Sequence, residues 1–245
     1  MPTLGLIGGS GLDEWGAPGS TVHALSPWGA PSGPISEYEV AGHRLYFLPR
    51  HGGDHALAPH KINYRANIHV LRALNVDAVV AINTVGALNR GYPPGGLSVP
   101  DQLIDYTWGR AHSFEDHSGP GVRHVEFAEP FSARWRERLL QAAAAVPVSV
   151  RDGACIGVTQ GPRLETAAEI RRLARDGCDL VGMTSMPEAG LAREAGLEYA
   201  CLALSANWAA GLEDQPISMA AIESTVSAAM NEVRQVVRTL LEQWS

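Results

Sequence analysis

The chain has 245 residues, of which 45% are hydrophobic and 18% are charged, and its formal net charge is −7. This length and apolar content suffice for one buried core, so we expect a single domain over residues 1–245. The negative charge argues against nucleic acid or an anionic membrane as a partner, because both require basic patches. A bound anion would therefore need a local cluster of donors.

Two further features bear on the class of protein. The N-terminal segment MPTLGLIGGSGLDEW has no basic region before its short apolar run, and no stretch approaches the roughly 18 continuous apolar residues of a membrane span. We therefore expect a cytoplasmic protein with no membrane partner. Cys155, Cys178 and Cys201 form no CxxC pair, so we expect buried free thiols and neither a disulfide framework nor a zinc site.

Strand-like and helix-like segments alternate along the chain. Short apolar runs, most of them followed by glycine or a polar turn, predict strands at residues 3–7, 44–48, 76–82, 153–158, 178–181 and 199–204. Composition and periodicity predict helices at residues 61–74, 130–145, 166–175 and 218–241. The alternation predicts the α/β class, with a largely parallel sheet and helices on its faces.

Two of the predicted helices carry clear signals. Residues 166–169 read T-A-A-E, a capping box that places Thr166 at the N-cap and Glu169 at the third helical position. In the C-terminal helix, apolar side chains recur at steps of three or four and form one stripe, for which core packing is a sufficient explanation. The stripe consists of Ile222, Val226, Met230, Val233, Val237 and Leu241.

Four polar clusters follow predicted strands, at the sheet edge where open α/β sheets bind their ligands. Residues 8–11, GGSG, lack the spacing of a dinucleotide or P-loop motif. They form either a tight turn or an anion cradle of backbone N–H groups and the Ser10 hydroxyl. Arg50 and His51 pair a guanidinium fork with an imidazole, which suits a phosphate oxyanion; a surface Arg-His pair is the alternative.

The third and fourth clusters offer short side chains. Asn83 and Thr84 either contact an anion or belong to a turn or helix cap. Thr184 and Ser185 precede Pro187, which we expect at the first helical position, so that free N–H groups point at whatever Thr184 contacts; a simple capping role is the alternative. Only one of the four clusters carries a full positive charge. Together they suit inorganic phosphate better than a polyphosphate that needs Mg²⁺.

Two further positions suit recognition of a base. Glu165 lies in the loop before the capping box, and Asn207 follows the last predicted strand. A carboxylate accepts hydrogen bonds, whereas an amide both donates and accepts, so the pair matches N1–H and O6 or N7 of a 6-oxopurine. Adenine would place its N1 acceptor against the carboxylate. The alternatives are support of a helix start for Glu165 and a turn for Asn207.

The chain resembles the trimeric purine nucleoside and methylthioadenosine phosphorylases in a series of motifs that occur in the family's order. They are GGSGL, LPRHGG, HKINYRAN, INTVGALN, AEPF, TQGPRLET and VGMTSMPEAGLAREAGL, followed by the strand before Asn207. The resemblance covers nearly the whole chain and is greatest to the bacterial S-methyl-5′-thioinosine phosphorylase branch. It implies the purine nucleoside phosphorylase-like fold, with a mixed, largely parallel central sheet flanked by helices.

The resemblance also implies the roles of individual residues. Met183 would pack beneath the ribose, and Glu165 and Asn207 would bind the base and take part in catalysis. The phosphate would be held by Ser10, Arg50, His51, Asn83, Thr84 and Thr184.

Three positions separate the branches of this family by base. Methylthioadenosine phosphorylases carry aspartates at the positions of Asn207 and Ala209, and a serine at the position of Glu165. The residues of this chain therefore resemble the 6-oxopurine pattern. Two positions depart from the family: Leu164 stands where many relatives have a base-stacking phenylalanine, and Trp208 where the thioinosine branch usually has proline.

The 5′ end of the ligand separates the branches further. Mammalian-type inosine and guanosine phosphorylases carry a histidine past the base-binding asparagine, which hydrogen-bonds the 5′-hydroxyl. This chain has no histidine after His124. Residues 218–222 instead predict an apolar wall that includes Met219 and suits a methylthio group. By resemblance, His124 would reach the 5′ end of the ligand in a neighbouring subunit.

The resemblance implies phosphorolysis of S-methyl-5′-thioinosine to hypoxanthine and 5-methylthioribose 1-phosphate, in purine and methylthio nucleoside salvage. Phosphate would be a co-substrate, and we expect no cofactor and no metal. The assembly implied is a homotrimer, with a hexamer as the alternative. Alternative functions are an inosine or guanosine phosphorylase, a methylthioadenosine phosphorylase, a nucleosidase that uses water, and a nucleoside-binding module without catalysis.

Overall fold

Helices cover both faces of the central sheet, and its inner strands are therefore apolar along most of their length. All six residues of β1 (Thr3–Gly8) are buried, as are the first six of β5 (Ala78–Ala87). The computed structural model describes residues 2–12, 14–17, 19–115 and 122–244.

The described strands form one mixed sheet. Its main path has the order β2-β3-β4-β1-β5-β10-β9-β7, and off this path β11 pairs with β5. β4 (His43–Pro49), β1, β5 and β11 (Glu198–Trp208) are parallel, so their carboxyl ends meet at one edge. β10 (Leu180–Gly182) and β9 (Cys155–Val158) are parallel to each other, but β10 is antiparallel to β5. The fourth polar cluster therefore reaches this edge from the opposite direction.

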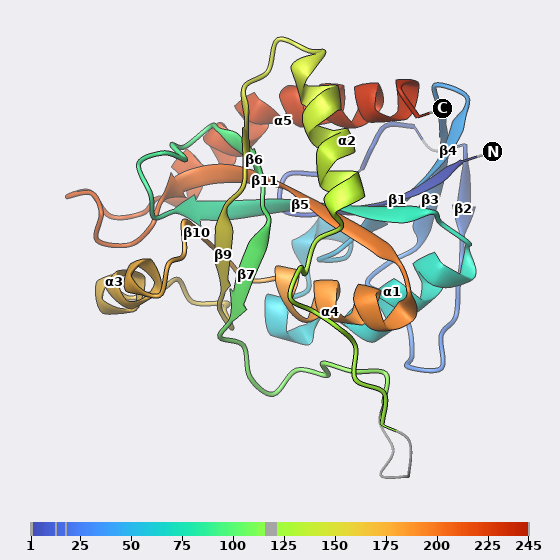
Figure 1. Cartoon of the computed structure of the whole chain (residues 1–245), viewed down its shortest axis with the longest axis horizontal. Coiled ribbons are helices and arrows are strands. Elements are labelled where there is room, and N and C mark those ends of the chain that lie inside the picture. Colours follow the sequence, from blue (N-terminus) through green and yellow to red (C-terminus); the bar gives the residue numbers. More distant parts are fainter. Residues whose placement is uncertain (1, 13, 18, 116–121, 245) are drawn as a thin grey trace.

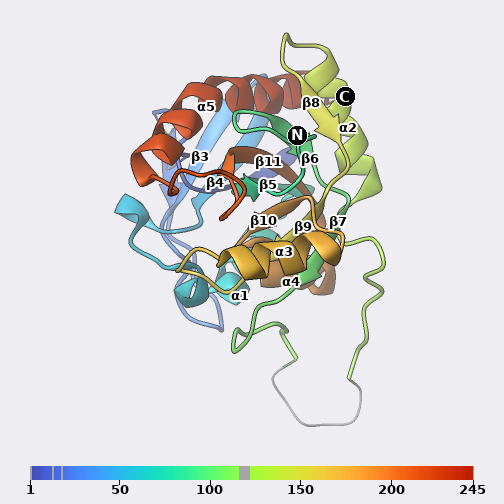
Figure 2. The ribbon, with the colours of Figure 1, turned by 90° about the vertical axis from the view of Figure 1, so that its left-hand side faces the viewer.

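Two helices lie on each face of the sheet (Figure 1). α2 (Ala133–Ala144) and α5 (Met219–Glu242) pack on each other and on β11 on one face, above the sheet in Figure 1. α1 (Tyr64–Ala73) and α4 (Ser185–Ala195) pack on each other on the opposite face. α3 (Ala167–Arg175) lies at the end of the sheet, beside β9 and β10 (Figure 2).

The segment between β7 (Gln102–Asp105) and α2 runs away from the body of the protein. Its described parts, residues 106–115 and 122–130, extend below the sheet in both views (Figures 1 and 2). Val122 on this segment is 60% exposed. Residues 122–130 still contact the body of the protein, since Arg123 Nη2 donates to the Glu194 carbonyl at 2.6 Å and Phe127 packs against the core.

The fold class and the predicted strands are confirmed. Each of the six predicted runs overlaps a strand, and the four predicted helices overlap α1, α2, α3 and α5. The prediction missed α4 as a complete helix and missed five strands: β2 (Ser20–Val22), β3 (Ile35–Val40), β6 (Leu97–Val99), β7 and β8 (Val150–Asp152). β3 mixes buried residues with partly and fully exposed ones, and the other four strands have only three or four residues, so none contains a long apolar run.

The structure also bears on the expectations for the cysteines and for membrane-spanning segments. All three cysteines are free, and Cys178 and Cys201 are buried, but Cys155 is only half-buried because it begins the short strand β9. Among the described residues, no helix combines the length and hydropathy needed to cross a membrane.

The capping box at the start of α3 is present as predicted. The Thr166 hydroxyl accepts a hydrogen bond from the Glu169 N–H at 3.1 Å, and the Glu169 carboxylate accepts one from the Thr166 N–H at 2.7 Å. Arg163 also binds this carboxylate, and its hydrogen bond, with that of Thr166, lowers the pKa of Glu169 to about 2. The box therefore stabilises the helix start directly after Glu165.

Thr166→Ala removes one half of this box. We expect a loss of about 1 kcal/mol in the free energy of unfolding, measured by urea denaturation at pH 7, because the N–H of Glu169 loses its acceptor. Thr166→Ser keeps the hydroxyl and is the matched control, for which we expect wild-type stability within about 0.3 kcal/mol. Equal losses in the two variants would contradict a capping role for the hydroxyl.

Candidate functional site

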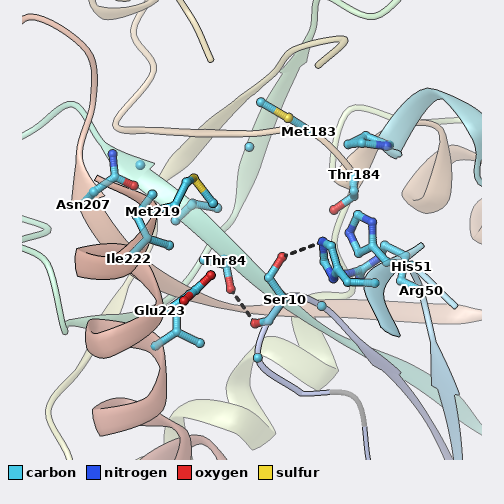
Figure 3. Close-up of a pocket in the computed structure, with 18 of the residues that line it drawn as sticks. Ser10, Arg50, His51, Thr84, Met183, Thr184, Asn207, Met219, Ile222 and Glu223 are labelled. Carbon is cyan, nitrogen blue, oxygen red and sulfur yellow. Dashed lines mark hydrogen bonds between the residues drawn. The ribbon is translucent and has the colours of Figure 1, made fainter. Parts of the chain in front are cut away.

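A cavity of about 1060 Å³ opens at the edge where the parallel strands end (Figure 3). It collects nearly all the residues that the sequence singled out, from seven separate segments. Those lining it are Ser10, Arg50, His51, Thr84, Glu165, Met183, Thr184, Asn207, Ala209 and Met219. In Figure 3, Arg50, His51 and Thr184 lie at one end of the cavity, Asn207, Met219 and Ile222 at the other, and Ser10 and Thr84 between them.

The glycine loop after β1 is both a tight turn and a wall of the cavity. The Leu12 N–H donates to the Gly9 carbonyl at 3.0 Å, which closes the turn. A Cβ on Gly9 would lie 2.4 Å from the Ile82 carbonyl oxygen, and Gly11 has a φ of +84° and would place a Cβ 2.1 Å from Val226. Both positions therefore require glycine. The two interpretations of this motif are compatible, since the turn presents Ser10 to the cavity.

A buried ion pair holds Arg50 in place. Arg50 is 1% exposed and Glu188 is fully buried. The Arg50 Nε donates to Glu188 Oε2 at 2.8 Å and Nη2 donates to Oε1 at 2.9 Å, a bidentate contact. The Tyr199 hydroxyl donates to the same Oε1 at 2.8 Å. The carboxylate thus compensates the charge of Arg50 and fixes the plane of its guanidinium group.

The remaining donors of Arg50 are also largely engaged. Nη1 donates to the Ile82 carbonyl at 3.0 Å, and Nη2 donates to Asn83 Oδ1 at 2.9 Å. Of the five N–H groups of an arginine, four are thus engaged by described residues, and one N–H on Nη1 remains for a ligand. The prediction of a guanidinium fork directed at the anion is therefore corrected: the fork binds Glu188, and Arg50 presents a single N–H to the cavity.

Asn83 lies behind Arg50 and does not line the cavity. Its Oδ1 accepts from Arg50, and its Nδ2 donates to the Ser185 hydroxyl at 2.7 Å. The side chain is 3% exposed. The expected direct contact of Asn83 with an anion is corrected accordingly, since its place in the structure is to connect Arg50 with the start of α4.

His51 faces the cavity beside a second histidine. Its Nδ1 lies 2.8 Å from the Leu57 carbonyl, which can only accept, so Nδ1 carries the proton. Burial, assisted by the nearby Arg50 and His55, lowers the pKa of His51 to about 4. The imidazole is therefore neutral at pH 7, with Nε2 as an acceptor. The ring of His55 stacks on it at 4.1 Å, and its Nε2 lies 3.5 Å from the Ser10 hydroxyl. The sequence analysis missed His55.

Two threonines complete the anion end of the cavity. The Thr84 hydroxyl donates to the Ser10 carbonyl at 3.0 Å and so joins β5 to the glycine loop. Thr184 makes no capping hydrogen bond, which leaves its hydroxyl available to a ligand. Met186 is extended, so the regular turns of α4 begin at Pro187, as predicted. Thr184 is the last residue of this segment that lines the cavity, so the helix that follows it is not itself part of the cavity wall.

The base end contains Glu165 and Asn207. The Thr159 hydroxyl donates to Glu165 Oε1 at 2.6 Å, which orients the carboxylate and leaves Oε2 for a ligand. The pairing of β11 with β5 shifts between Ser205 and Asn207, which identifies a β-bulge. Bulges next to active sites redirect side chains. The Asn207 Nδ2 donates to the Trp208 carbonyl at 2.7 Å, so Oδ1 and one N–H remain for a ligand.

The wall formed by α5 is less apolar than predicted. Met219, Ile222 and Val226 line the cavity, so the first turns of the apolar stripe serve the site as well as the core. Glu223, however, lines the same cavity beside Ile222 (Figure 3). The predicted wall ended at residue 222 and did not include the carboxylate of Glu223.

His124 does not line the cavity of its own chain. It is exposed on the segment that runs away from the body of the protein. This position leaves open the implied contact with a neighbouring subunit. Leu164, which departs from the family pattern, lines the cavity and is 42% exposed.

Sequence reasoning missed four residues that support the site: Glu188, Tyr199, Thr159 and Arg110. Glu188 carried a usable signal, since a glutamate among the small residues of PEAG is unusual in a buried helix. The other three gave none, because their contacts join distant parts of the chain. Within the described residues, no three His, Cys, Asp or Glu side chains cluster as a metal site would require.

The chain is similar to known proteins over nearly its whole length. The family described as the phosphorylase superfamily matches residues 3–242. The probable S-methyl-5′-thioinosine phosphorylase of Xanthomonas campestris pv. campestris is 51% identical over 244 residues, which cover 97% of this chain and 96% of the relative. A probable S-methyl-5′-thioinosine phosphorylase of Xylella fastidiosa is 58% identical over 231 residues, which cover 91% and 96%.

Solved structures share the fold. The methylthioadenosine phosphorylase from Schistosoma mansoni, in complex with adenine, superposes with a TM-score of 0.93 at 30% sequence identity. The superposition covers 98% of this chain and 91% of the other.

Glu188→Leu and Arg50→Met each leave one buried charge without its partner. We expect each to lower the free energy of unfolding by about 3–5 kcal/mol in urea denaturation. The double variant removes both charges, so its loss should be smaller than the sum of the single losses by about 2 kcal/mol or more. It should nevertheless fail to bind inorganic phosphate in calorimetry, because Arg50 is gone. Additive losses would show that the two side chains do not stabilise the fold as a pair.

Proposed function

The chain belongs to the phosphorylase superfamily, and we propose that it catalyses phosphate-dependent cleavage of a 6-oxopurine nucleoside, with S-methyl-5′-thioinosine as the substrate. The observation that carries this proposal is the joining of two kinds of group in one cavity. Donors suited to phosphate lie at one end, and the Glu165 and Asn207 pair lies at the other. A ribose bound over Met183 would connect them.

The proposed reaction is attack of phosphate on C1′ while the glycosidic bond breaks. Phosphate is the co-substrate of this superfamily, and the chemistry needs no metal and no protein nucleophile. Ser10 and Thr184, with the single free N–H of Arg50, would hold the anion, and Thr84 would join them by turning its hydroxyl from the Ser10 carbonyl to the phosphate. The products are the free base and 5-methylthioribose 1-phosphate.

The charges around the anion end support an oxocarbenium-like transition state. Glu188 balances Arg50, and His51 is neutral at pH 7. A phosphate dianion bound there is held mainly by neutral donors and keeps most of its charge. That charge can then stabilise the positive sugar as the bond to the base breaks, which lowers the barrier.

The base end favours hypoxanthine over adenine. Thr159 engages one oxygen of Glu165, so the other can accept the N1–H of a 6-oxopurine. Adenine offers an acceptor at N1, which would leave the carboxylate unpaired. Asn207 retains an oxygen and one N–H for the base, and a hydrogen bond that strengthens as charge develops on the leaving purine would contribute to catalysis.

The methylthio group fits the wall of Met219, Ile222 and Val226. Two relatives named as probable S-methyl-5′-thioinosine phosphorylases are 51% and 58% identical to the chain. A second candidate is an inosine or guanosine phosphorylase. Glu223 favours it, because a carboxylate in this wall can accept a hydrogen bond from a 5′-hydroxyl. The apolar side chains outnumber it, so the thioether remains our choice.

The proposal extends to the assembly and the location. We place the enzyme in the cytoplasm, in nucleoside salvage, as a homotrimer. The exposed segment that carries His124 would reach the cavity of the neighbouring subunit and close the 5′ end of the ligand there. This arrangement accounts for the exposure of His124 on its own chain.

Release of free base from four nucleosides, each with and without phosphate, tests the proposal. Turnover of methylthioinosine should depend on phosphate and exceed that of methylthioadenosine by about 10- to 100-fold in kcat/KM, since one unpaired hydrogen-bonding group costs about 1–3 kcal/mol. Inosine and guanosine should be slower than methylthioinosine. Faster inosine turnover would favour the second candidate, and hydrolysis without phosphate would exclude a phosphorylase.

Asn207→Asp introduces a carboxylate at the base end. The ratio of methylthioadenosine to methylthioinosine turnover should rise by about 10-fold, because a carboxylic acid or carboxylate at this position pairs better with a 6-aminopurine edge. Asn207→Ala is the control and should slow both substrates without changing their ratio. If the aspartate variant keeps the wild-type ratio, Asn207 does not read the base.

A further inference from the structure

The ends of β9 and β10 separate at the site. The two strands are parallel, and their last backbone contact is the Thr159 N–H, which donates to the Gly182 carbonyl at 2.8 Å. Beyond it, one chain continues as a loop over residues 159–165 and the other as a loop over residues 183–186. The first carries Glu165 at the base end of the cavity, and the second carries Met183 and Thr184.

Arg110 lies between these loops. Its Nη1 donates to the carbonyls of Met183 and Met186 at 2.8 and 2.6 Å. Its Nη2 donates to the carbonyls of Gln160 and Thr159 at 2.9 and 3.3 Å, and its Nε donates to the Gln160 side chain at 3.2 Å. One guanidinium group therefore connects four backbone carbonyls of two loops.

The surroundings of Arg110 fix it in turn. Nη1 also lies 3.3 Å from the Tyr64 hydroxyl, and the guanidinium carbon lies 5.6 Å from the centre of the Tyr64 ring. Tyr64 is 3% exposed and donates its own hydroxyl to the Pro59 carbonyl at 2.9 Å. The residues that Arg110 hydrogen-bonds within the described chain offer carbonyl, amide or phenol oxygens and no carboxylate.

The loops also contact each other directly. Gly161 has a φ of +57°, and a Cβ there would lie 2.4 Å from the sulfur of Met183. Small changes in the distance between the loop of residues 159–165 and the loop of residues 183–186 therefore matter at this contact. A change of a few tenths of an ångström at Gly161 would move Met183, on which the sugar would rest.

We propose that Arg110 is a positioning residue that fixes the loop bearing Glu165 against the loop bearing Met183 and Thr184, and so sets the spacing between base and phosphate. Arg110 does not line the cavity, so it acts through the two loops. The inference rests on the proposed function for its kinetic consequence and on the structure alone for the locking of the loops.

The chemistry requires an arginine. Carbonyl groups that project in different directions need several donors held in one rigid plane, which a guanidinium provides and an ammonium does not. Arg110→Lys should therefore recover little of the activity that Arg110→Ala loses. Arg136 offers a matched control, since it also binds two backbone carbonyls, those of Pro100 and Val99, at 2.8 and 3.3 Å, but these residues do not line the cavity. Arg136 also binds the Asp152 carboxylate.

The experiment compares Arg110→Ala, Arg110→Lys and Arg136→Ala in the full chain. With methylthioinosine and phosphate, kcat/KM of Arg110→Ala should fall about 100-fold, the cost of displacing groups by about 1 Å, while Arg136→Ala stays within about 3-fold of wild type. Arg110→Lys should recover less than a tenth of the loss. Added guanidinium chloride at millimolar concentrations should raise the activity of Arg110→Ala several-fold and leave Arg136→Ala unchanged.

Hydrogen exchange measured by mass spectrometry supplies a readout that needs no turnover. In Arg110→Ala, amides of residues 159–165 and 183–186 should exchange faster than in wild type, and the two loops should be unaffected in Arg136→Ala. Wild-type exchange in both loops overturns the inference, as does faster exchange with unchanged kcat/KM. If the wild-type protein turns over no nucleoside, the proposed function fails, and the exchange data alone decide whether Arg110 locks the loops.

Discussion

The buried ion pair of Arg50 and Glu188 is the contact on which the site depends. It joins the end of β4 to α4, and through Ile82, Asn83 and Tyr199 it also reaches β5 and β11. Two charges this deep are tolerated only when each is paired and hydrogen-bonded. The network therefore requires these elements to meet in one arrangement. The arrangement places the glycine loop, the two threonines and His51 around one anion-sized space.

The same pair explains how an acidic chain can bind an anion. The overall charge is −7, and the one arginine among the four polar clusters is neutralised by its partner. Attraction of the anion by net charge therefore contributes little to its binding. Directed donors, from hydroxyls and from one N–H of Arg50, take its place, and they leave the charge of a bound phosphate available to the reacting sugar.

The other end of the cavity depends on loops and on the irregular end of β11. The bulge at Ser205 and Asn207 turns the asparagine into the cavity, Thr159 orients Glu165, and Arg110 holds their loop against Met183. Specificity for the base and for the 5′ group thus lies in segments that can vary while the sheet stays the same. This separation agrees with a family whose members act on different purine nucleosides.

The sequence by itself determined the α/β class, six of the strands, four of the helices and the positions of the polar clusters, because apolar periodicity and cap residues are local signals. It also placed Ser10, Arg50, His51 and Thr84 together, since parallel strands end at a common edge, whereas Thr184 reaches that edge from the antiparallel β10. Only the tertiary structure decided what each side chain contacts. Glu188 lies 138 residues from Arg50, so nothing local could show that the guanidinium fork is occupied, that Asn83 lies behind it, or that Glu223 and Arg110 belong near the site. Such pairings depend on which elements pack against one another, and a linear pattern does not contain that information.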